Sequence, residues 1–196
     1  MAEINAQTVM ELRRLTGISM MECKKALSEN SGDIQKAVKH LKEKGLAFAE
    51  KKASRQATQG IIASYVHSNL KIGVLVELNC ETDFVARNEE FREMGKEIAM
   101  QICAMNPVAV TEDQVPAAYI DEQKEIFLAQ MKDSGKPKEV NEKIVEGKLR
   151  KFISEQCLLE QQYVKDASRK IKDLITEKIQ KLGENIKIGR FIRYEI

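Results

Sequence analysis

Hydrophobic residues recur at helical spacing over the first 52 residues, and two polar breaks divide them into three runs. Val9, Leu12 and Leu15 mark the first predicted helix, which ends at residues 16–17 (TG). Residues 19–22 (SMME) then form the Ser-x-x-Glu pattern of a capping box, whose hydroxyl and carboxylate bind free amides at a helix start. A second helix is therefore predicted to begin there.

The second break, residues 30–33 (NSGD), ends that helix and supplies caps for a third. The second helix is predicted to bury Met21, Ala26 and Leu27. The apolar stripe of the third is formed by Ile34, Ala37, Val38 and Leu41. Gly45 is predicted to end it. These runs predict a small N-terminal module of three helices, residues 1–52.

Alternation of apolar and polar residues replaces the helical pattern after residue 60. Residues 61–66 (IIASYV) and 72–78 (IGVLVEL) predict two strands, joined by a turn at residues 67–69. The last residues, 188–196 (IGRFIRYEI), predict another strand with Ile192, Tyr194 and Ile196 on one face. Since a two-stranded hairpin is rarely stable alone, we expect a three-stranded antiparallel sheet.

Helices are predicted between these strands. One long apolar face, which ends before Pro107, contains Phe91, Met94, Ile98, Ile102 and Met105. Further helices are predicted over residues 119–132, from about Pro137 onward, and after Ser168 until Gly183. The predicted fold is therefore α+β, with the three-helix module followed by a mostly helical core domain that contains the sheet, residues 53–196.

Composition narrows the class of protein. The 32 Lys and Arg residues nearly balance the 30 Asp and Glu residues, so the net charge of +2 argues against a dedicated nucleic-acid binder. Four scattered cysteines without a CxxC pair indicate free thiols in a reducing cytoplasm, and two histidines far from them argue against zinc. The N-terminus lacks the pattern of a secretory signal, and no segment is apolar enough to span a membrane.

No signature of an enzyme is found: there is no GxSxG, no GxGxxG after a strand and no Walker-type loop. We therefore expect no catalytic residue, no bound metal and no cofactor. The unusual local feature is residues 80–88 (CETDFVARN), directly after the strongest predicted strand. Thr82 or Asp83 is expected to cap a new helix with Phe84 in its first turn. From the spacing alone, Phe84 is either a core residue or an exposed ring that binds a partner.

The order of several motifs resembles that of the elongation factor Ts family. The matching segments are residues 11–17 (ELRRLTG), 20–27 (MMECKKAL), 32–37 (GDIQKA), 77–86 (ELNCETDFVA), 135–138 (GKPK), 145–148 (VEGK) and 189–194 (GRFIRY). The segment at residues 77–86 is the most diagnostic of them. Together they extend from one end of the chain to the other.

The resemblance implies a guanine-nucleotide exchange factor for the GTPase elongation factor Tu. Such a factor binds both the GDP-bound and the nucleotide-free form of the GTPase. It implies a ubiquitin-associated (UBA)-like fold for the three-helix module, in which Leu12 and Arg13 match positions that contact the partner. Thr82, Asp83, Phe84 and Val85 match the segment that enters the GTPase and disturbs its bound magnesium. The chain looks like a short family member with one core unit, so we also expect a homodimer.

Two other interpretations remain open. A UBA-type adaptor would bind a partner without exchange activity. Residues 82–85 argue against this interpretation, because a passive adaptor would not need such a segment. An RNA-associated factor would use Lys51, Lys52 and Arg55, although no aromatic residue lies among these basic side chains for base stacking. Direct binding of nucleic acid or membrane is not expected.

Overall fold

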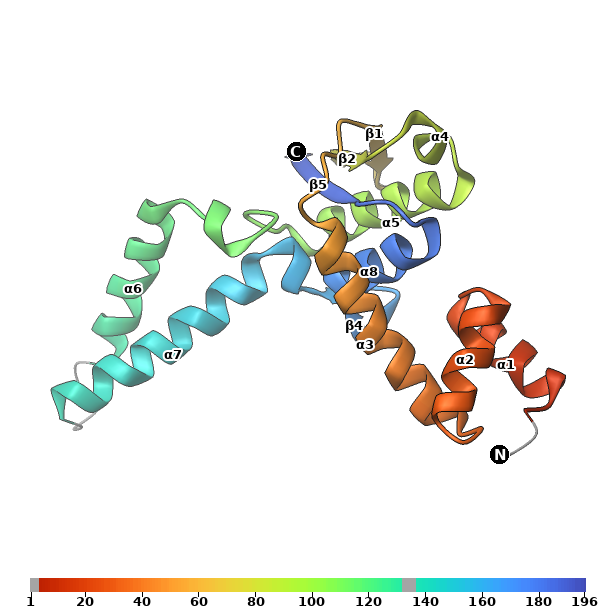
Figure 1. The fold of residues 1–196 in the computed structure, drawn as a ribbon. Coiled ribbons are helices and arrows are strands. Elements are labelled where there is room, and N and C mark those ends of the chain that lie inside the picture. Colours follow the sequence, from red (N-terminus) through yellow and green to blue (C-terminus); the bar gives the residue numbers. More distant parts are fainter. Residues whose placement is uncertain (1–3, 132–136) are drawn as a thin grey trace. The chain divides into compact units, whose positions relative to one another are not determined.

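A computed structural model describes residues 4–131 and 137–196 (Figure 1). Its elements, in chain order, are α1 (Ala6–Thr16), α2 (Met20–Glu29), α3 (Ile34–Lys52), β1 (Gln59–Val66), β2 (Ile72–Cys80), α4 (Asp83–Ala86), α5 (Glu89–Met105), the 3-10 helix η1 (Glu112–Gln114), α6 (Ala117–Met131), α7 (Lys138–Gln156), the 3-10 helix η2 (Leu158–Glu160), β3 (Gln162–Tyr163), β4 (Asp166–Lys170), α8 (Ile171–Leu182) and β5 (Lys187–Glu195). Residues 1–3, residue 132 of one predicted helix, and Gly135 and Lys136 of one motif lie outside the described residues.

The chain divides into two compact units, and each is considered by itself. The first contains residues 1–61, 78–92 and 173–187, and the second contains residues 62–77, 93–172 and 188–196. The predicted domain boundary after residue 52 coincides with the last residue of α3. Whether residues 1–52 form a separate domain stays a prediction.

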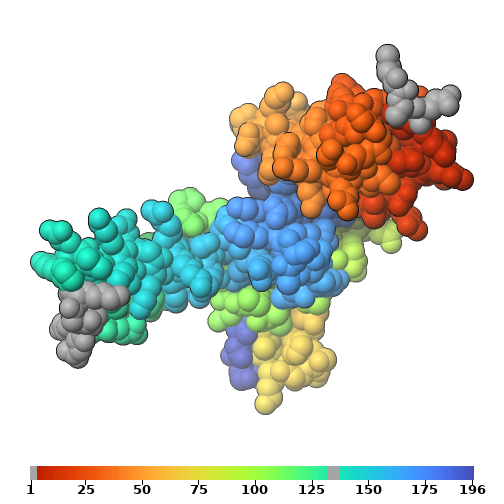
Figure 2. Space-filling model, turned by 90° about the horizontal axis from the view of Figure 1, so that it is seen from below, coloured from red at the N-terminus to blue at the C-terminus, as the bar shows by residue number. Residues whose placement is uncertain are grey.

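The N-terminal residues form the predicted bundle of three helices, consistent with a UBA-like fold. Side chains of Asn5, Ser19 and Asp33 cap the helices by accepting hydrogen bonds from backbone N–H groups two or three residues later. The bundle encloses its own core, made of Val9, Leu12, Cys23, Ala26, Leu27, Ala37 and Leu41. In the space-filling view its side chains, red to orange, form one closely packed body (Figure 2).

Two residues of the helical runs are on the surface of the bundle, Leu15 and Met21, and the second was predicted to be buried. Leu15 is 60% exposed and Met21 is 75% exposed. Because each residue turns an α-helix by about 100°, Leu15 lies about 120° around the helix from Val9, outside the buried stripe. The same angle separates Met21 from Leu27, so that Cys23 takes the buried position instead.

The predicted end of the third helix was also wrong. Instead of stopping at Gly45, α3 continues to Lys52. Gly45 is buried within the helix, and a Cβ atom there would lie 2.5 Å from Oε1 of Gln180 in α8. This glycine lies beside the end of the Gln180 side chain and does not terminate α3.

The predicted antiparallel sheet is confirmed, with strand order β1-β2-β5. Strand β2 buries alternate side chains, Val74, Val76, Leu78 and Cys80. Gly60 in β1 runs against this strand so closely that a Cβ atom would lie 2.2 Å from the carbonyl oxygen of Leu78. Ile192, Tyr194 and Ile196, predicted to share a face, are all exposed.

A second, two-stranded sheet, β3-β4, was not predicted. Its strands are two and five residues long, and the sequence of β4 (DASRK) has no apolar alternation. Pairing within such short polar segments is decided by neighbouring structure rather than by local pattern.

The predicted central helices are present. In α5, Phe91, Met94, Ile98 and Ile102 are fully buried, whereas Met105 at its end is 47% exposed. Helices α6 and α7 pack together as a hairpin through the rings of Tyr119, Phe127 and Phe152. Helix α8 ends at Leu182, and Gly183 follows it with φ +75°. No helix among the described residues is long and apolar enough to cross a membrane.

Candidate partner-binding segment

The segment at residues 80–88 forms a single helical turn at the end of β2. Thr82 is the N-cap of α4, as expected, and its Oγ1 accepts a hydrogen bond from the N–H of Val85 at 3.4 Å. Two residues before Thr82, the buried thiol of Cys80 donates a hydrogen bond to the Thr82 carbonyl oxygen at 3.1 Å. Burial raises the pKa of this thiol, which favours the protonated form that donates.

The two sides of α4 differ in exposure. Val85 and Ala86 are 6% and 7% exposed, so they attach the turn to the body of the protein. Phe84 is 80% exposed, which excludes the interpretation of this ring as a core residue of the chain. Asp83 is also exposed and forms an ion pair with Arg87 at 2.9 Å. The segment therefore presents an aromatic ring and a carboxylate outward from a buried base.

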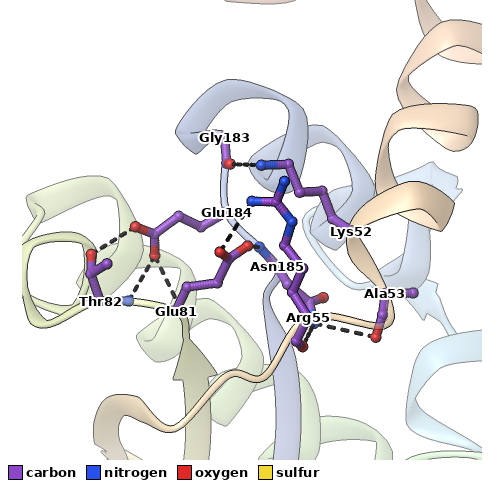
Figure 3. A network of polar contacts seen from close by, with 8 residues as sticks. All are labelled: Lys52, Ala53, Arg55, Glu81, Thr82, Gly183, Glu184 and Asn185. Atoms are coloured by element: carbon purple, nitrogen blue, oxygen red, sulfur yellow. Dashed lines mark hydrogen bonds and ion pairs between the residues drawn. The ribbon is translucent and has the colours of Figure 1, made fainter.

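A network of polar contacts fixes this base (Figure 3). The Glu184 carboxylate accepts hydrogen bonds from the N–H groups of Glu81 and Thr82, at 3.1 and 3.0 Å, and from the Thr82 hydroxyl at 2.6 Å. The Glu81 carboxylate in turn accepts from the N–H of Asn185 at 2.7 Å and from Arg55 at 3.3 Å.

The charge of Glu81 is favoured by these donors. The Asn185 N–H, and then the Arg55 guanidinium, lower the pKa of this carboxyl below its usual range. Near neutral pH the network is therefore built around a carboxylate that acts as an acceptor. Sequence reasoning missed Glu184 and Asn185, because about a hundred residues separate them from the segment they contact and no local motif marks them.

The N-terminal candidates, Leu12 and Arg13, lie in different environments. Leu12 is 0% exposed within the core of the bundle, so its side chain does not reach the surface of α1. Arg13 is exposed and, with Met10, Arg14 and Met20, lines a shallow pocket of about 320 Å³. Sequence reasoning missed Met10 and Met20 as surface candidates, because their exposure is visible only in the structure. Methionine is common at adaptable binding surfaces.

Both regions share features with protein-binding surfaces. Each presents apolar side chains next to a charge, and exposed aromatic and arginine side chains contribute much of the energy at protein interfaces. Among the described residues, no group of three or more His, Cys, Asp or Glu side chains is placed to hold a metal ion. The class that fold and site together indicate is a protein that acts by binding another protein.

Comparison with known proteins gives the family. The Elongation factor TS family matches residues 2–196. An elongation factor Ts of Thermosipho melanesiensis is 57% identical over 193 residues, 98% of each chain. The elongation factor Ts of Thermodesulfovibrio yellowstonii is 58% identical, covering 98% of this chain and 96% of the relative, and that of Fervidobacterium nodosum is 56% identical, covering 99% and 98%. The chain belongs to the elongation factor Ts family and has the role of a translation elongation factor.

Proposed function

We propose that this chain is a guanine-nucleotide exchange factor for elongation factor Tu. It binds the GDP-bound GTPase, disturbs the magnesium site there and promotes release of GDP. The single observation that carries this proposal is the exposure of Phe84 on a turn whose other side is buried. A ring that is rigid, exposed and anchored is suited to enter a neighbouring protein.

Exchange of this kind requires no covalent chemistry from the factor. Magnesium bridges the nucleotide phosphates to the GTPase, so displacing its ligands weakens the binding of GDP. The factor must bind the nucleotide-free state more tightly than the GDP state. The coupling is reciprocal: the factor weakens GDP binding by the same ratio by which GDP weakens binding of the factor.

The residues contribute in different ways. Phe84 is the wedge that repacks the GTPase near the phosphates, and Asp83 supplies a polar contact beside it. Thr82 caps α4, and Val85 holds the turn to the protein through its buried side chain. These four roles divide the segment into two residues that contact the partner and two that support them.

In the three-helix module, Arg13 makes a charged contact with the nucleotide-binding domain of the GTPase. Met10 and Met20, which line the same pocket, supply the apolar part of that surface. Leu12 supports the contact from inside the bundle, since its side chain fills the core under α1. Leu12 matches a family position that contacts the partner, and its buried side chain gives it this supporting part in the contact.

The test is the release of labelled GDP from elongation factor Tu, with and without this protein. We expect release to accelerate with increasing concentration of the factor until it saturates. The competing UBA-type adaptor would bind the GTPase in a pull-down without accelerating release. Binding with an unchanged release rate would therefore refute exchange activity and favour the adaptor.

A homodimer is the second part of the proposal. The strands of the three-stranded sheet carry apolar side chains that are 43–66% exposed in the single chain, namely Ile62, Val66, Leu75, Ile192 and Tyr194. In β2, Leu75 points away from the core because its neighbours Val74 and Val76 are buried. An apolar sheet face of this kind is suited to bind a second copy. A monomeric mass by light scattering at micromolar concentration would contradict the dimer.

Direct binding of RNA is not part of the proposed function. Two of the three basic residues that it requires already have partners within the chain. Lys52 donates to the carbonyl oxygen of Gly183 at 2.7 Å, and Arg55 pairs with Glu81. Lack of RNA binding at low salt, where phosphate contacts are strongest, would agree with this assignment.

A further inference from the structure

We propose that Glu184 is the positioning residue for Phe84. Its carboxylate fixes the backbone at residues 81–82 and thereby determines where α4 begins and where the Phe84 ring is held. This inference rests on the proposed exchange function for its biological meaning, but the geometry behind it belongs to this chain alone.

The contacts of Glu184 restrain the segment at both of its carboxylate oxygens. Oε2 accepts from two successive backbone N–H groups, those of Glu81 and Thr82, and Oε1 accepts from the Thr82 hydroxyl. Three donors on one carboxylate hold the Thr82 peptide in its extended conformation, with φ −127° and ψ 156°. Hydrogen bonds to an ionised acceptor are stronger than those between neutral groups.

Helix α4 is too short to be stable by itself. It is four residues long, which is shorter than a stable helical nucleus, so its conformation depends on its cap and on its contacts with the rest of the protein. The cap hydroxyl that accepts from Val85 is the same hydroxyl that donates to Glu184. The Glu184 contact therefore sets the orientation of the cap from which Phe84 projects.

Glu184 is itself held in place by its neighbours in sequence. The carbonyl oxygen of Gly183 accepts from Lys52 at 2.7 Å. Asn185 is 2% exposed, and its Nδ2 donates to the carbonyl oxygens of Ala53 and Arg55, at 3.4 and 2.7 Å. Figure 3 shows these segments converging on the end of β2. The carboxylate is thus presented from a loop that is pinned on both sides.

The pattern of partners distinguishes Glu184 from an ordinary surface carboxylate. Glu160, for comparison, accepts from the ammonium groups of Lys170 and Lys172, which is a typical surface ion pair. The three hydrogen bonds of Glu184 go instead to two backbone N–H groups and a hydroxyl of one short segment. Such an arrangement shapes a backbone rather than neutralising a charge.

The first experiment measures the position of the ring without any GTPase. Because the chain has no tryptophan, Phe84→Trp provides a single fluorescent reporter at the tip of α4. Time-resolved anisotropy is compared between Phe84→Trp alone and its combinations with Glu184→Ala or Glu184→Gln. We expect Glu184→Ala to increase the amplitude of fast motion about two-fold, because two N–H groups and the Thr82 hydroxyl lose their acceptor. Glu184→Gln keeps an acceptor oxygen and should restore most of the restraint.

The second experiment uses Phe84 unchanged and measures GDP release from elongation factor Tu. We expect Glu184→Ala to lower the maximal release rate about ten-fold and to change the half-saturating concentration less than two-fold, since other surfaces supply most of the affinity. Glu184→Gln should recover the rate to within about three-fold of the wild type. Glu160→Ala is the matched control, because it removes a hydrogen-bonded carboxylate that makes no contact with the segment, and its rate should be that of the wild type.

The outcomes separate the two proposals. Unchanged anisotropy in the Glu184→Ala reporter would overturn the positioning role, whatever the exchange assay gives. If the reporter loosens but wild-type protein does not accelerate GDP release, positioning stands and the exchange function fails. A higher half-saturating concentration with an unchanged maximal rate in Glu184→Ala would show a merely structural role and refute the proposal. Equal losses of the release rate in Glu184→Ala and Glu160→Ala would do the same.

Discussion

Truncating Phe84 and truncating its neighbour Val85 should have different effects: the first should lower affinity for the GTPase, and the second should lower the stability of the fold. Phe84→Ala removes a ring that is 80% exposed, so the free energy of unfolding should change by no more than about 0.5 kcal/mol. Burying such a ring in a partner is worth about 2 kcal/mol. The variant should therefore bind nucleotide-free elongation factor Tu about 30-fold more weakly than the wild type does.

Val85→Ala is the matched comparison. Its side chain is 6% exposed, so removing two methyl groups from this site should lower the free energy of unfolding by about 2 kcal/mol. At 25 °C, where the variant is still folded, affinity for the GTPase should fall by less than about five-fold.

Urea unfolding and isothermal titration against the nucleotide-free GTPase measure the two quantities on the same preparations. The reasoning requires a crossed result, in which one variant loses affinity and the other loses stability. If Phe84→Ala binds within two-fold of the wild type, or if it loses as much stability as Val85→Ala, the ring is not the binding element and the division of α4 into an outer and an inner side is wrong.

Three further predictions concern other parts of the fold. Gly60→Ala should lower the free energy of unfolding by at least about 2 kcal/mol in urea titrations, because a Cβ atom would lie 2.2 Å from a backbone oxygen of β2; an unchanged midpoint would contradict this. Hydrogen bonds from Lys170, and then from Lys172, lower the pKa of Glu160, so this group should contribute stability above its ordinary pKa of 4.5 that is lost as the pH falls through its lower folded value. Compared with the wild type, Glu160→Gln should thus be less stable at pH 7 and lose less stability on acidification. Plots of the free energy of unfolding against pH that run parallel for the two proteins from pH 7 to pH 3 would refute this. Tyr194→Asp should convert the proposed dimer to a monomer in sedimentation experiments without changing the far-ultraviolet circular dichroism, since the side chain is 66% exposed in the single chain.

Local chemistry explains which parts of the fold could be predicted. Ser19 was identified as a cap from sequence, and the other two caps were located to residues 30–33 and to Thr82 or Asp83, because a cap depends on residues only a few positions away. The strands of the larger sheet were found because alternation in a half-buried strand is visible in the sequence. Motif order then indicated the family, which the comparisons confirm.

What could not be predicted depends on contacts between distant residues. Gly45 has the signal of a helix end, but it lies inside α3, where it packs beside the side-chain end of Gln180, 135 positions later. Spacing left open whether Phe84 was buried, since one turn of helix has no periodicity to reveal its inner side. Glu184 carries no local signal at all, because its role arises only when α8 ends beside β2.

The brevity of α4 has a consequence for any attempt to imitate this protein. A synthetic peptide that copies residues 80–88 would be unstructured in water, because the turn has neither the length nor the cap geometry to form alone. Transplanting the aromatic tip onto another scaffold, or designing an inhibitor that mimics it, would require the loop at residues 183–185 as well. The smallest portable unit is therefore a pair of segments about a hundred residues apart in sequence and in contact in the fold, and not a linear epitope.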